Sequence, residues 1–342
     1  MARTNTQIFL ANRPPNDGAI DPKLGATFDQ RRVPVPEQLP ADSVLIEVKY
    51  LSCDPAMRGW LRDARSYLPP VQIGETMRAA GLGVVVASTS SAFQVGDEVS
   101  ATTGWQTHAV MPAKQVEKLP KREGAELIDA LGVLGSSGMT GYWGLFDVAG
   151  LKGGEVVVVT GAAGSVGSVV VQLAKLKGCT VIATAGSDDK VRWLKEELGA
   201  DAAFNYKSPT FSADLKKCCQ KEYKFVDVVF DNVGGEQLDA LLLCLRRYAR
   251  IALCGAISDY NRAPAGLRNY QTLIAMEAKI QGFIVFTYAS RYEEARQQLA
   301  KWIGEGKLKR NFCYAEGGIL GTPQALVDLF SGVNKGKMVV PL

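Results

Sequence analysis

The sequence predicts an α/β protein in which a doubly wound parallel sheet is joined to a second, mostly β domain. The length of 342 residues suits two domains better than one compact unit. Short β-like runs separated by proline and glycine turns fill residues 1–128, whereas helical and strand segments alternate over residues 129–304. Residues 305–342 return to short, irregular pieces, which we expect to rejoin the first domain.

The first domain is predicted to be built from short strands. Hydrophobic patterning indicates strands at residues 43–50, 83–87 and 95–101. His108, the single histidine, lies in the run WQTHAV, which is typical of a further strand. A lone histidine in a strand is more often structural than catalytic, so we assign it no chemistry.

The second domain is predicted to contain successive βαβ units, because strands and helices alternate at short intervals. We expect strands at 156–160, 180–185, 202–205, 226–230 and 249–254, and helices at 165–177, 188–198, 212–221 and 236–245. A later strand at 279–286 and a helix at 292–304 complete the domain. That strand is apolar, and we expect it at or near the sheet edge, where it favours pairing with a second copy in a homodimer.

The run VVVVTGAAGSVG at 156–167 predicts a nucleotide site in a Rossmann-type fold. Aligned to G-x-G-x-x-G, its key positions are Ala162, Gly164 and Gly167; Ala162 departs from the pattern but is small enough for the tight turn. Gly164 lets the backbone approach a pyrophosphate, and Gly167 lets the following helix pack closely. The helix N-terminus presents free N–H groups to phosphates. The alternative is an ordinary strand-to-helix turn.

The end of the next strand favours NADPH over NADH. An NAD enzyme usually places an acid there for the ribose hydroxyl, but this chain has Gly186 and Ser187. Asp188 and Asp189 lie slightly beyond the position at which that acid is expected, and Lys190 follows them. A small residue with a nearby cation accepts a 2′-phosphate. The two aspartates also suit the start of a helix, which does not prevent Lys190 from reaching a phosphate.

Charge and cysteine content exclude several classes of function. The net charge of +4 is modest and the basic residues are spread along the chain, so we expect neither a nucleic-acid nor a membrane partner. The N-terminus lacks the apolar core of a signal peptide. Seven irregularly spaced cysteines fit a reduced compartment, so we expect a cytoplasmic protein. With one histidine and no cysteine cluster, we expect no metal site.

Segments spread almost from end to end carry a family resemblance. They are LSCDPAMRGW (51–60), GMTGYWGLFDV (138–148), GAAGSVG (161–167), AGSDDKVRWLKEELGAD (185–201), AFNYK (203–207), FDNVGGEQLD (230–239), RIALCGAISDYN (250–261), IQGFIVF (280–286) and GVNKGKMVV (332–340). Together they resemble the zinc-independent branch of the medium-chain dehydrogenase/reductase superfamily. Within it, the chain is similar to the leukotriene B4 dehydrogenase, prostaglandin reductase and alkenal double-bond reductase group.

The resemblance implies a function and a set of site residues. Members of the group use NADPH to reduce the C=C bond of α,β-unsaturated aldehydes and ketones. The fold implied is a Rossmann domain at 129–304 and a GroES-like catalytic domain made of 1–128 and 305–342. The implied cofactor-binding residues are Met139, Thr140, Gly164, Ser165, Val166, Gly167, Gly186, Lys190, Tyr206, Asn232, Cys254, Gly255, Ala256, Ile257, Ser258, Phe283, Ile284, Val285 and Asn334.

Within this set, the resemblance assigns Lys190 and Tyr206 to the 2′-phosphate. Asn334 would supply an amide from the other domain, although a turn residue in G-V-N-K-G is an equal interpretation.

Two departures from the pattern of the group concern the substrate. The group often has an aromatic residue where this chain has Ala56, and plant members often have tyrosine where it has Leu82. Both positions are expected near the substrate, so a different pocket is predicted.

The chemistry follows from hydride delivery to the β-carbon of an enone or enal. Negative charge then develops on the carbonyl oxygen as an enolate, which a donor stabilises and an acid protonates at the α-carbon. Tyr260 is the candidate catalytic residue, first as a donor that orients the substrate. The nicotinamide ribose hydroxyl or water could supply the proton instead. The alternatives are a quinone reductase, a pathway-specific reductase of a natural-product intermediate and an NADPH-binding sensor.

Overall fold

The computed structural model describes residues 4–342, which divide into two compact units, 4–132 with 312–342 and 133–311. The division lies at 132 and 311, whereas the sequence pattern suggested 128 and 304. The 3₁₀ turn Leu127–Leu131 packs with Leu82 and Val339 of the first unit. The side chain of Gln172 hydrogen-bonds both backbone groups of Lys309, which ties that segment to the second unit.

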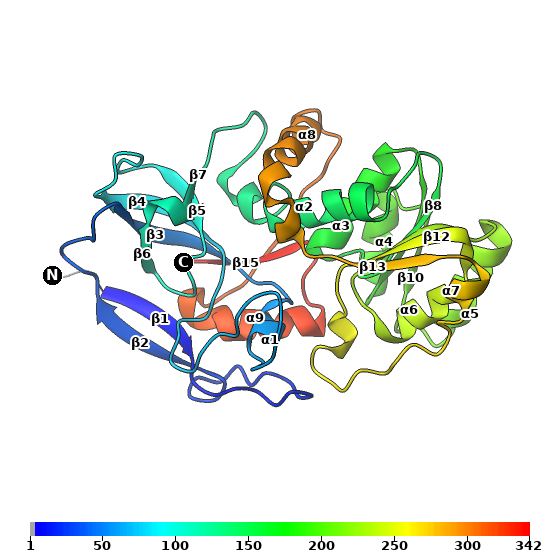
Figure 1. The fold of residues 1–342 in the computed structure, drawn as a ribbon, viewed down its shortest axis with the longest axis horizontal. Coiled ribbons are helices and arrows are strands. Elements are labelled where there is room, and N and C mark those ends of the chain that lie inside the picture. The colour runs from blue at the N-terminus through cyan, green and yellow to red at the C-terminus, as the bar shows by residue number, and fades with distance from the viewer. Residues whose placement is uncertain (1–3) are drawn as a thin grey trace. The chain divides into compact units, whose positions relative to one another are not determined.

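The second unit is built on a six-stranded parallel sheet in the order β10-β9-β8-β11-β12-β13 (Figure 1). Counted within the unit, the order is 3-2-1-4-5-6, that of the Rossmann fold, which confirms the predicted fold class. Its strands are β8 (Val156–Val159), β9 (Thr180–Ala185), β10 (Ala202–Asn205), β11 (Val226–Asp231), β12 (Leu245–Leu253) and β13 (Lys279–Gly282). The strand order reverses between β8 and β11, the two central strands.

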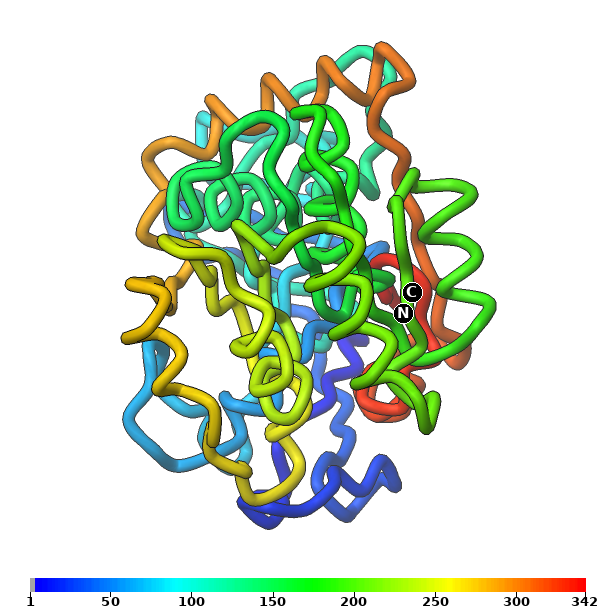
Figure 2. The backbone as a smooth tube through the Cα atoms, turned by 90° about the vertical axis from the view of Figure 1, so that its right-hand side faces the viewer, coloured from blue at the N-terminus to red at the C-terminus, as the bar shows by residue number. Residues whose placement is uncertain are grey.

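Helices cover both faces of this sheet, and the successive crossovers can be followed from green to orange in Figure 2. They are α2 (Ser136–Trp143), α3 (Ser165–Leu176), α4 (Asp188–Glu196), α5 (Phe211–Lys217), α6 (Gly235–Leu242), α7 (Thr272–Ala275) and α8 (Tyr292–Gly304). Val156 and Val158 pack in one core cluster with α5 and α6. Because side chains alternate along a strand, Val157 and Val159 face the opposite layer, which explains the unbroken valine run.

Several expected elements of the second unit have other bounds. The strand expected at 279–286 stops at Gly282, because its partner β12 ends and the Phe283 ring turns onto Phe230, 6.2 Å between centroids. The helix expected at 212–221 becomes a π turn at Cys218–Glu222. The helix expected at 236–245 ends at Leu242, and β12 starts at Leu245 rather than at 249. The edge position of β13 is confirmed.

The first unit is a mostly antiparallel β structure. Its seven-stranded sheet comprises β14 (Phe312–Tyr314), β15 (Lys337–Pro341), β3 (Ser43–Ser52), β4 (Gly81–Ser88), β5 (Glu98–Ala101), β7 (Val116–Lys118) and β6 (His108–Pro112), and β1 (Thr4–Leu10) pairs with β2 (Phe28–Pro34). β5 starts three residues later than expected, because the Asp97 carboxylate accepts from Gln94 N and Gly96 has a φ of 94° in the preceding turn. The helices α1 (Met57–Trp60) and α9 (Thr322–Ser331) also belong to this unit.

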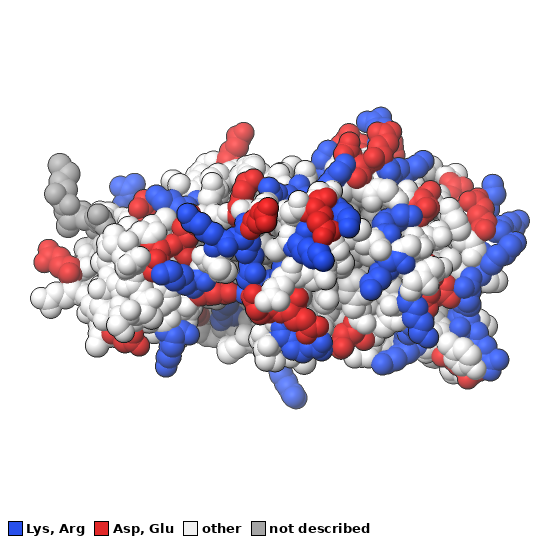
Figure 3. Space-filling view, turned by 90° about the horizontal axis from the view of Figure 1, so that it is seen from above, with Lys and Arg blue, Asp and Glu red and all other residues white. Residues whose placement is uncertain are grey.

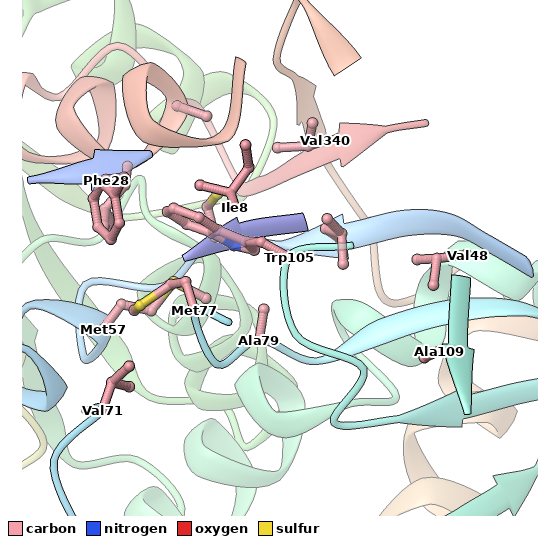
Figure 4. Close-up of a cluster of buried hydrophobic side chains, with 14 of the residues drawn as sticks. Ile8, Phe28, Val48, Met57, Val71, Met77, Ala79, Trp105, Ala109 and Val340 are labelled. Atoms are coloured by element: carbon pink, nitrogen blue, oxygen red, sulfur yellow. The ribbon is translucent and has the colours of Figure 1, made fainter. Parts of the chain in front are cut away.

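The C-terminal segment does rejoin this unit, since β15 pairs with β3, but it is not irregular as expected. It forms α9 and β15, whose Leu326 and Val340 enter the core. Trp105 lies at the centre of that core, 5.0 Å from Phe28 between ring centroids (Figure 4). Burial of one side chain such as Leu326 or Val340 contributes about 1.5–3 kcal/mol to the free energy of folding, so the C-terminal segment is part of the folding unit.

The surface matches the modest net charge. On the face shown in Figure 3, basic and acidic side chains are interspersed. Within residues 4–342, no helix has the length and apolar character needed to cross a membrane.

Candidate nucleotide-binding site

The predicted site residues of the second unit gather at the carboxyl ends of its central strands. β8 leads into the glycine turn 161–167, β11 leads into Asn232, and β12 leads into Cys254. Since β8, β11 and β12 are adjacent in the sheet, these three connections meet at one edge. Ligands of doubly wound sheets bind at this edge, where the strand order reverses.

The glycine turn 161–167 leads into a helix N-terminus that suits an anion. Gly164 is the N-cap residue of α3, and no side chain caps that helix end. The first turn carries no acidic residue, so its amides and the positive dipole end favour an anion. A Cβ added to Gly164 would meet only the Gly161 carbonyl oxygen, at 3.3 Å, so the approach to the amides is unobstructed. Half-buried Ser165 and Val166 flank this approach.

Gly167 serves packing rather than ligand approach. A Cβ at this position would lie 2.5 Å from the carbonyl oxygen of Gly161 and 2.7 Å from the Cα of Ala162. Both are backbone atoms that cannot swing aside. The turn itself bends at Gly161, whose φ is +57°. The roles that the sequence predicted for the two later fingerprint glycines therefore correspond to two different local environments.

Asp231, at the end of β11, connects the three strand ends. Its completely buried carboxylate accepts hydrogen bonds from Thr160 Oγ1 at 2.6 Å, Gly234 N at 2.9 Å and Val233 N at 3.3 Å. Its backbone carbonyl accepts from Cys254 N at 2.8 Å. Burial raises the pKa of the carboxyl group, and these donors oppose that rise.

Asn232 is committed to the same network. Its Nδ2 donates to the Thr160 carbonyl oxygen at 2.7 Å, and its backbone N–H donates to Thr160 Oγ1 at 2.9 Å. Its own carbonyl accepts from Ile257 N at 3.3 Å. The side chain expected to contact the cofactor therefore fixes the turn after β8, and its backbone fixes the loop after β12.

The loop 254–260 rests on two glycines. Gly234 and Gly235 both have positive φ, +70° and +53°. A Cβ on Gly235 would lie 2.6 Å from Ser258 Oγ, and one on Gly234 would lie 3.0 Å from the Ala256 Cβ. Ser258 N also donates to the Val233 carbonyl at 3.1 Å. The two loops therefore pack as one layer, which only glycine at these positions permits.

Tyr260 lies at the end of that loop, after the short 3₁₀ turn Ile257–Asp259. Its hydroxyl oxygen accepts a hydrogen bond from Ala256 N at 3.3 Å. A hydroxyl that accepts in this way retains a proton that it can donate.

Nearby, burial raises the pKa of the Cys254 thiol to about 12, with a further contribution from Asp231. Cys254 is therefore a protonated thiol at neutral pH and not a nucleophile.

The predicted phosphate-discriminating residues lie at the ends of β9 and β10. Tyr206 N donates to the Ala185 carbonyl at 2.9 Å, which brings Tyr206 beside Gly186. A Cβ on Gly186 would lie 2.9 Å from the Tyr206 hydroxyl. Lys190 is in the first turn of α4, where its N–H donates to the N-cap Ser187 Oγ at 3.3 Å. Gly186 therefore gives room to Tyr206, while α4 presents a cation.

The remaining predicted residues of the second unit lie on α2 and after β13. Met139 is completely buried, and Thr140 Oγ1 donates to the Ser136 carbonyl at 2.7 Å within α2. Phe283 packs inward, whereas Ile284 is 37% exposed next to buried Val285.

Asn334 belongs to the first unit. Its Nδ2 donates to the Gly336 carbonyl at 2.8 Å and closes a turn, which agrees with its interpretation as a turn residue. Leu82 is completely buried in the cluster with Ile128, Leu131 and Val339. Its expected proximity to the substrate stays a prediction. Ala56 is half-buried at the start of α1.

Sequence reasoning missed Thr160, Asp231 and Asn205. Thr160 directly follows the buried strand β8, and Asp231 is the last residue of the buried strand β11; a polar side chain at the end of an apolar run was the available signal. Asn205 ends β10 and is described below. Across residues 4–342, no group of three or more His, Cys, Asp or Glu side chains could hold a metal ion.

Two family models match the chain. One, described as the N-terminal domain of oxidoreductase, matches residues 7–119, and one described as zinc-binding dehydrogenase matches residues 165–302. Prostaglandin reductase 1 of Bos taurus is 39% identical, over 92% of this chain and 93% of its own. The NADP-dependent 2-alkenal reductase of Nicotiana tabacum is 39% identical, over 90% and 89%. The crystal structure of CurA from Vibrio vulnificus in complex with NADPH superposes with a TM-score of 0.90 at 37% identity, covering 98% of each chain.

Proposed function

This chain belongs to the zinc-independent branch of the medium-chain dehydrogenase/reductase superfamily, and we propose that it reduces the C=C bond of α,β-unsaturated ketones and aldehydes. It is an NADPH-dependent oxidoreductase. One observation carries the choice of reaction: a prostaglandin reductase and a 2-alkenal reductase each match nine-tenths or more of the chain. A 2-alkenal holds a C=C bond conjugated with a carbonyl group, and that is the class of substrate proposed.

The second unit supplies the groups that bind the cofactor. The uncapped amides of α3 would bind the pyrophosphate, and Lys190 with Tyr206 would bind the 2′-phosphate. When bound, NADPH supplies a hydride. The layer formed by the loops 231–235 and 254–260 would support the nicotinamide end, since it lies at the carboxyl ends of β11 and β12.

Tyr260 is proposed as the donor to the substrate carbonyl. Arrival of a hydride at the β-carbon moves negative charge to the carbonyl oxygen, where a phenol hydrogen bond lowers the energy of the developing enolate. The contact with Ala256 N holds the Tyr260 oxygen in place before substrate arrives. A cofactor ribose hydroxyl or water can then protonate the α-carbon.

Oxidation of NADPH with a panel of acceptors tests the proposal. Enones and enals should give a higher kcat/KM than quinones with the same purified protein. Higher efficiency with quinones would favour a quinone reductase, and turnover confined to bulky conjugated ketones would favour a pathway-specific reductase. NADPH binding without turnover of any acceptor would indicate a sensor.

We also propose a homodimer and a cytoplasmic location. β13 is the edge strand of the six-stranded sheet, and Ile284 and Phe286 beyond it are 37% and 51% exposed. An exposed apolar edge favours pairing with a second copy. The seven cysteines are free thiols, which suits a reducing compartment. Light scattering at micromolar concentration tests the dimer, and a monomeric mass would contradict it.

A further inference from the structure

The end of β10 carries a side chain that bridges two elements of the 2′-phosphate region. Asn205 Nδ2 donates to the Asp188 carboxylate at 2.8 Å, and Asn205 Oδ1 accepts from Lys207 N at 3.0 Å. Asp188 opens α4, the helix of Lys190, whereas Lys207 follows Tyr206. One amide thus ties the helix that carries the cation to the loop that carries the tyrosine.

The bridge matters because Asp188 is an acid near a proposed anion site. A carboxylate in the first turn of a helix is favoured by the dipole, yet its charge opposes a 2′-phosphate. The hydrogen bond from Asn205 fixes the direction of this carboxylate toward β10. Residues two apart on a helix do not share a face, so the Asp188 carboxylate held at β10 is separated from the helix face that carries Lys190.

The same amide orders the other side. With Lys207 N bound to Asn205, the Lys207 ammonium lies 6.0 Å from the Tyr206 ring centroid. This cation–π distance adds positive charge next to Tyr206. The neighbouring backbone contact, Tyr206 N to the Ala185 carbonyl, holds the tyrosine against Gly186.

We propose that Asn205 is a specificity-determining positioning residue, which favours the 2′-phosphate of NADPH by holding the Asp188 carboxylate. The inference rests on the proposed NADPH site. It does not require Asn205 to contact the cofactor. Because the Asn205–Asp188 bond is exposed to solvent, its loss should cost little folding stability.

Calorimetric binding of adenosine 2′,5′-bisphosphate and of AMP measures the effect without catalysis. Asn205→Ala should weaken binding of the bisphosphate about three- to ten-fold, which corresponds to the energy of the one hydrogen bond that holds Asp188. The same variant should change the dissociation constant of AMP by less than about two-fold. Asp188→Asn removes the charge and keeps an oxygen that can accept. The double variant Asn205→Ala/Asp188→Asn should therefore recover bisphosphate binding to within about two-fold of the parent.

Ser208→Ala, which removes a hydroxyl that hydrogen-bonds Thr210 in the same loop, is the matched control and should match the parent. Equal weakening of both probes by Asn205→Ala would overturn the proposal, as would a double variant no tighter than Asn205→Ala. Lys190→Ala distinguishes a failure of the inference about Asn205 from a failure of the proposed NADPH site. If this variant binds the bisphosphate as tightly as the parent, the proposed phosphate site itself is wrong. A failure of enone reduction with these binding results intact would reject only the proposed reaction.

Discussion

Thr160, the residue directly after β8, and Asp231, the last residue of the adjacent strand β11, form a hydrogen bond of 2.6 Å, and both residues are completely buried. The donor lies 71 residues from the acceptor in the chain. The bond joins the strand before the glycine turn to the strand before Asn232, so it holds together the two sides of the point where the strand order reverses.

Thr160→Val should destabilise the protein in a pH-dependent way. The pKa of the Asp231 carboxyl group is higher in the folded protein than in the unfolded chain, so ionisation of this group opposes folding. The stability that the group contributes to the protein is therefore greatest below its unfolded-state pKa and is lost as the pH rises through its folded-state pKa. Loss of the Thr160 hydroxyl raises that pKa further. Urea unfolding should show a cost of up to about 1.5–3 kcal/mol, and the cost should be larger at pH 7.5 than at pH 4.5, because a greater fraction of the carboxyl group is ionised at the higher pH. An equal cost at both pH values would contradict this assignment.

Gly164→Ala and Gly167→Ala should separate ligand approach from packing. The new methyl group at 167 would meet backbone at 2.5 Å and should destabilise the fold by about 1–3 kcal/mol. The methyl group at 164 has 3.3 Å to its nearest atom, so it should lower the melting temperature less than the methyl group at 167 does, and it should weaken NADPH binding. Calorimetric melting and NADPH titration measure the two effects. The reverse pattern would show that the glycine roles are misassigned.

Lys190→Ala should weaken NADPH selectively. A charge-assisted contact to phosphate is worth about 1.5–3 kcal/mol, and NADH has no phosphate to lose. Lys195→Ala is the control, since Lys195 is exposed in the last turn of the same helix. Dissociation constants for both coenzymes check the prediction. Equal affinity of the unmodified protein for NADH and NADPH would be incompatible with it.

Tyr260→Phe should lower enone turnover about ten-fold and leave NADPH binding nearly intact, as expected for loss of one orienting hydrogen bond. A general acid would be worth about 10²–10⁴-fold, so the magnitude distinguishes the two roles. Tyr248→Phe serves as the control, because Tyr248 is 58% exposed within β12. Steady-state kinetics with one enone decide the matter. Unchanged turnover and unchanged KM would remove Tyr260 from the mechanism.

Local sequence was sufficient for the elements that are determined locally. The four valines of β8 predict a strand buried on both faces, and the glycines that follow predict the turn. The end of β13 was not predictable, because it depends on the Phe283 ring packing onto Phe230, a contact between distant segments. The burial of Leu82 likewise depends on Val339 at the far end of the chain.

The site shows the same division. Gly164, Gly186 and Lys190 follow from motif spacing, but the function of Asp231 requires knowing that β8 and β11 are neighbours. Asn205 acts through Asp188 only because β10 ends beside the start of α4. Polar residues that end buried strands are therefore the positions at which sequence analysis should search for such networks.

The central claim is hydride addition to the β-carbon of a conjugated carbonyl compound. The most direct measurement is the position of deuterium in the product formed from NADPH that carries deuterium at both C4 positions, determined by NMR and mass spectrometry. We predict a saturated ketone or aldehyde with one deuterium at the β-carbon and a solvent proton at the α-carbon. An allylic alcohol with deuterium on the carbonyl carbon would contradict the claim.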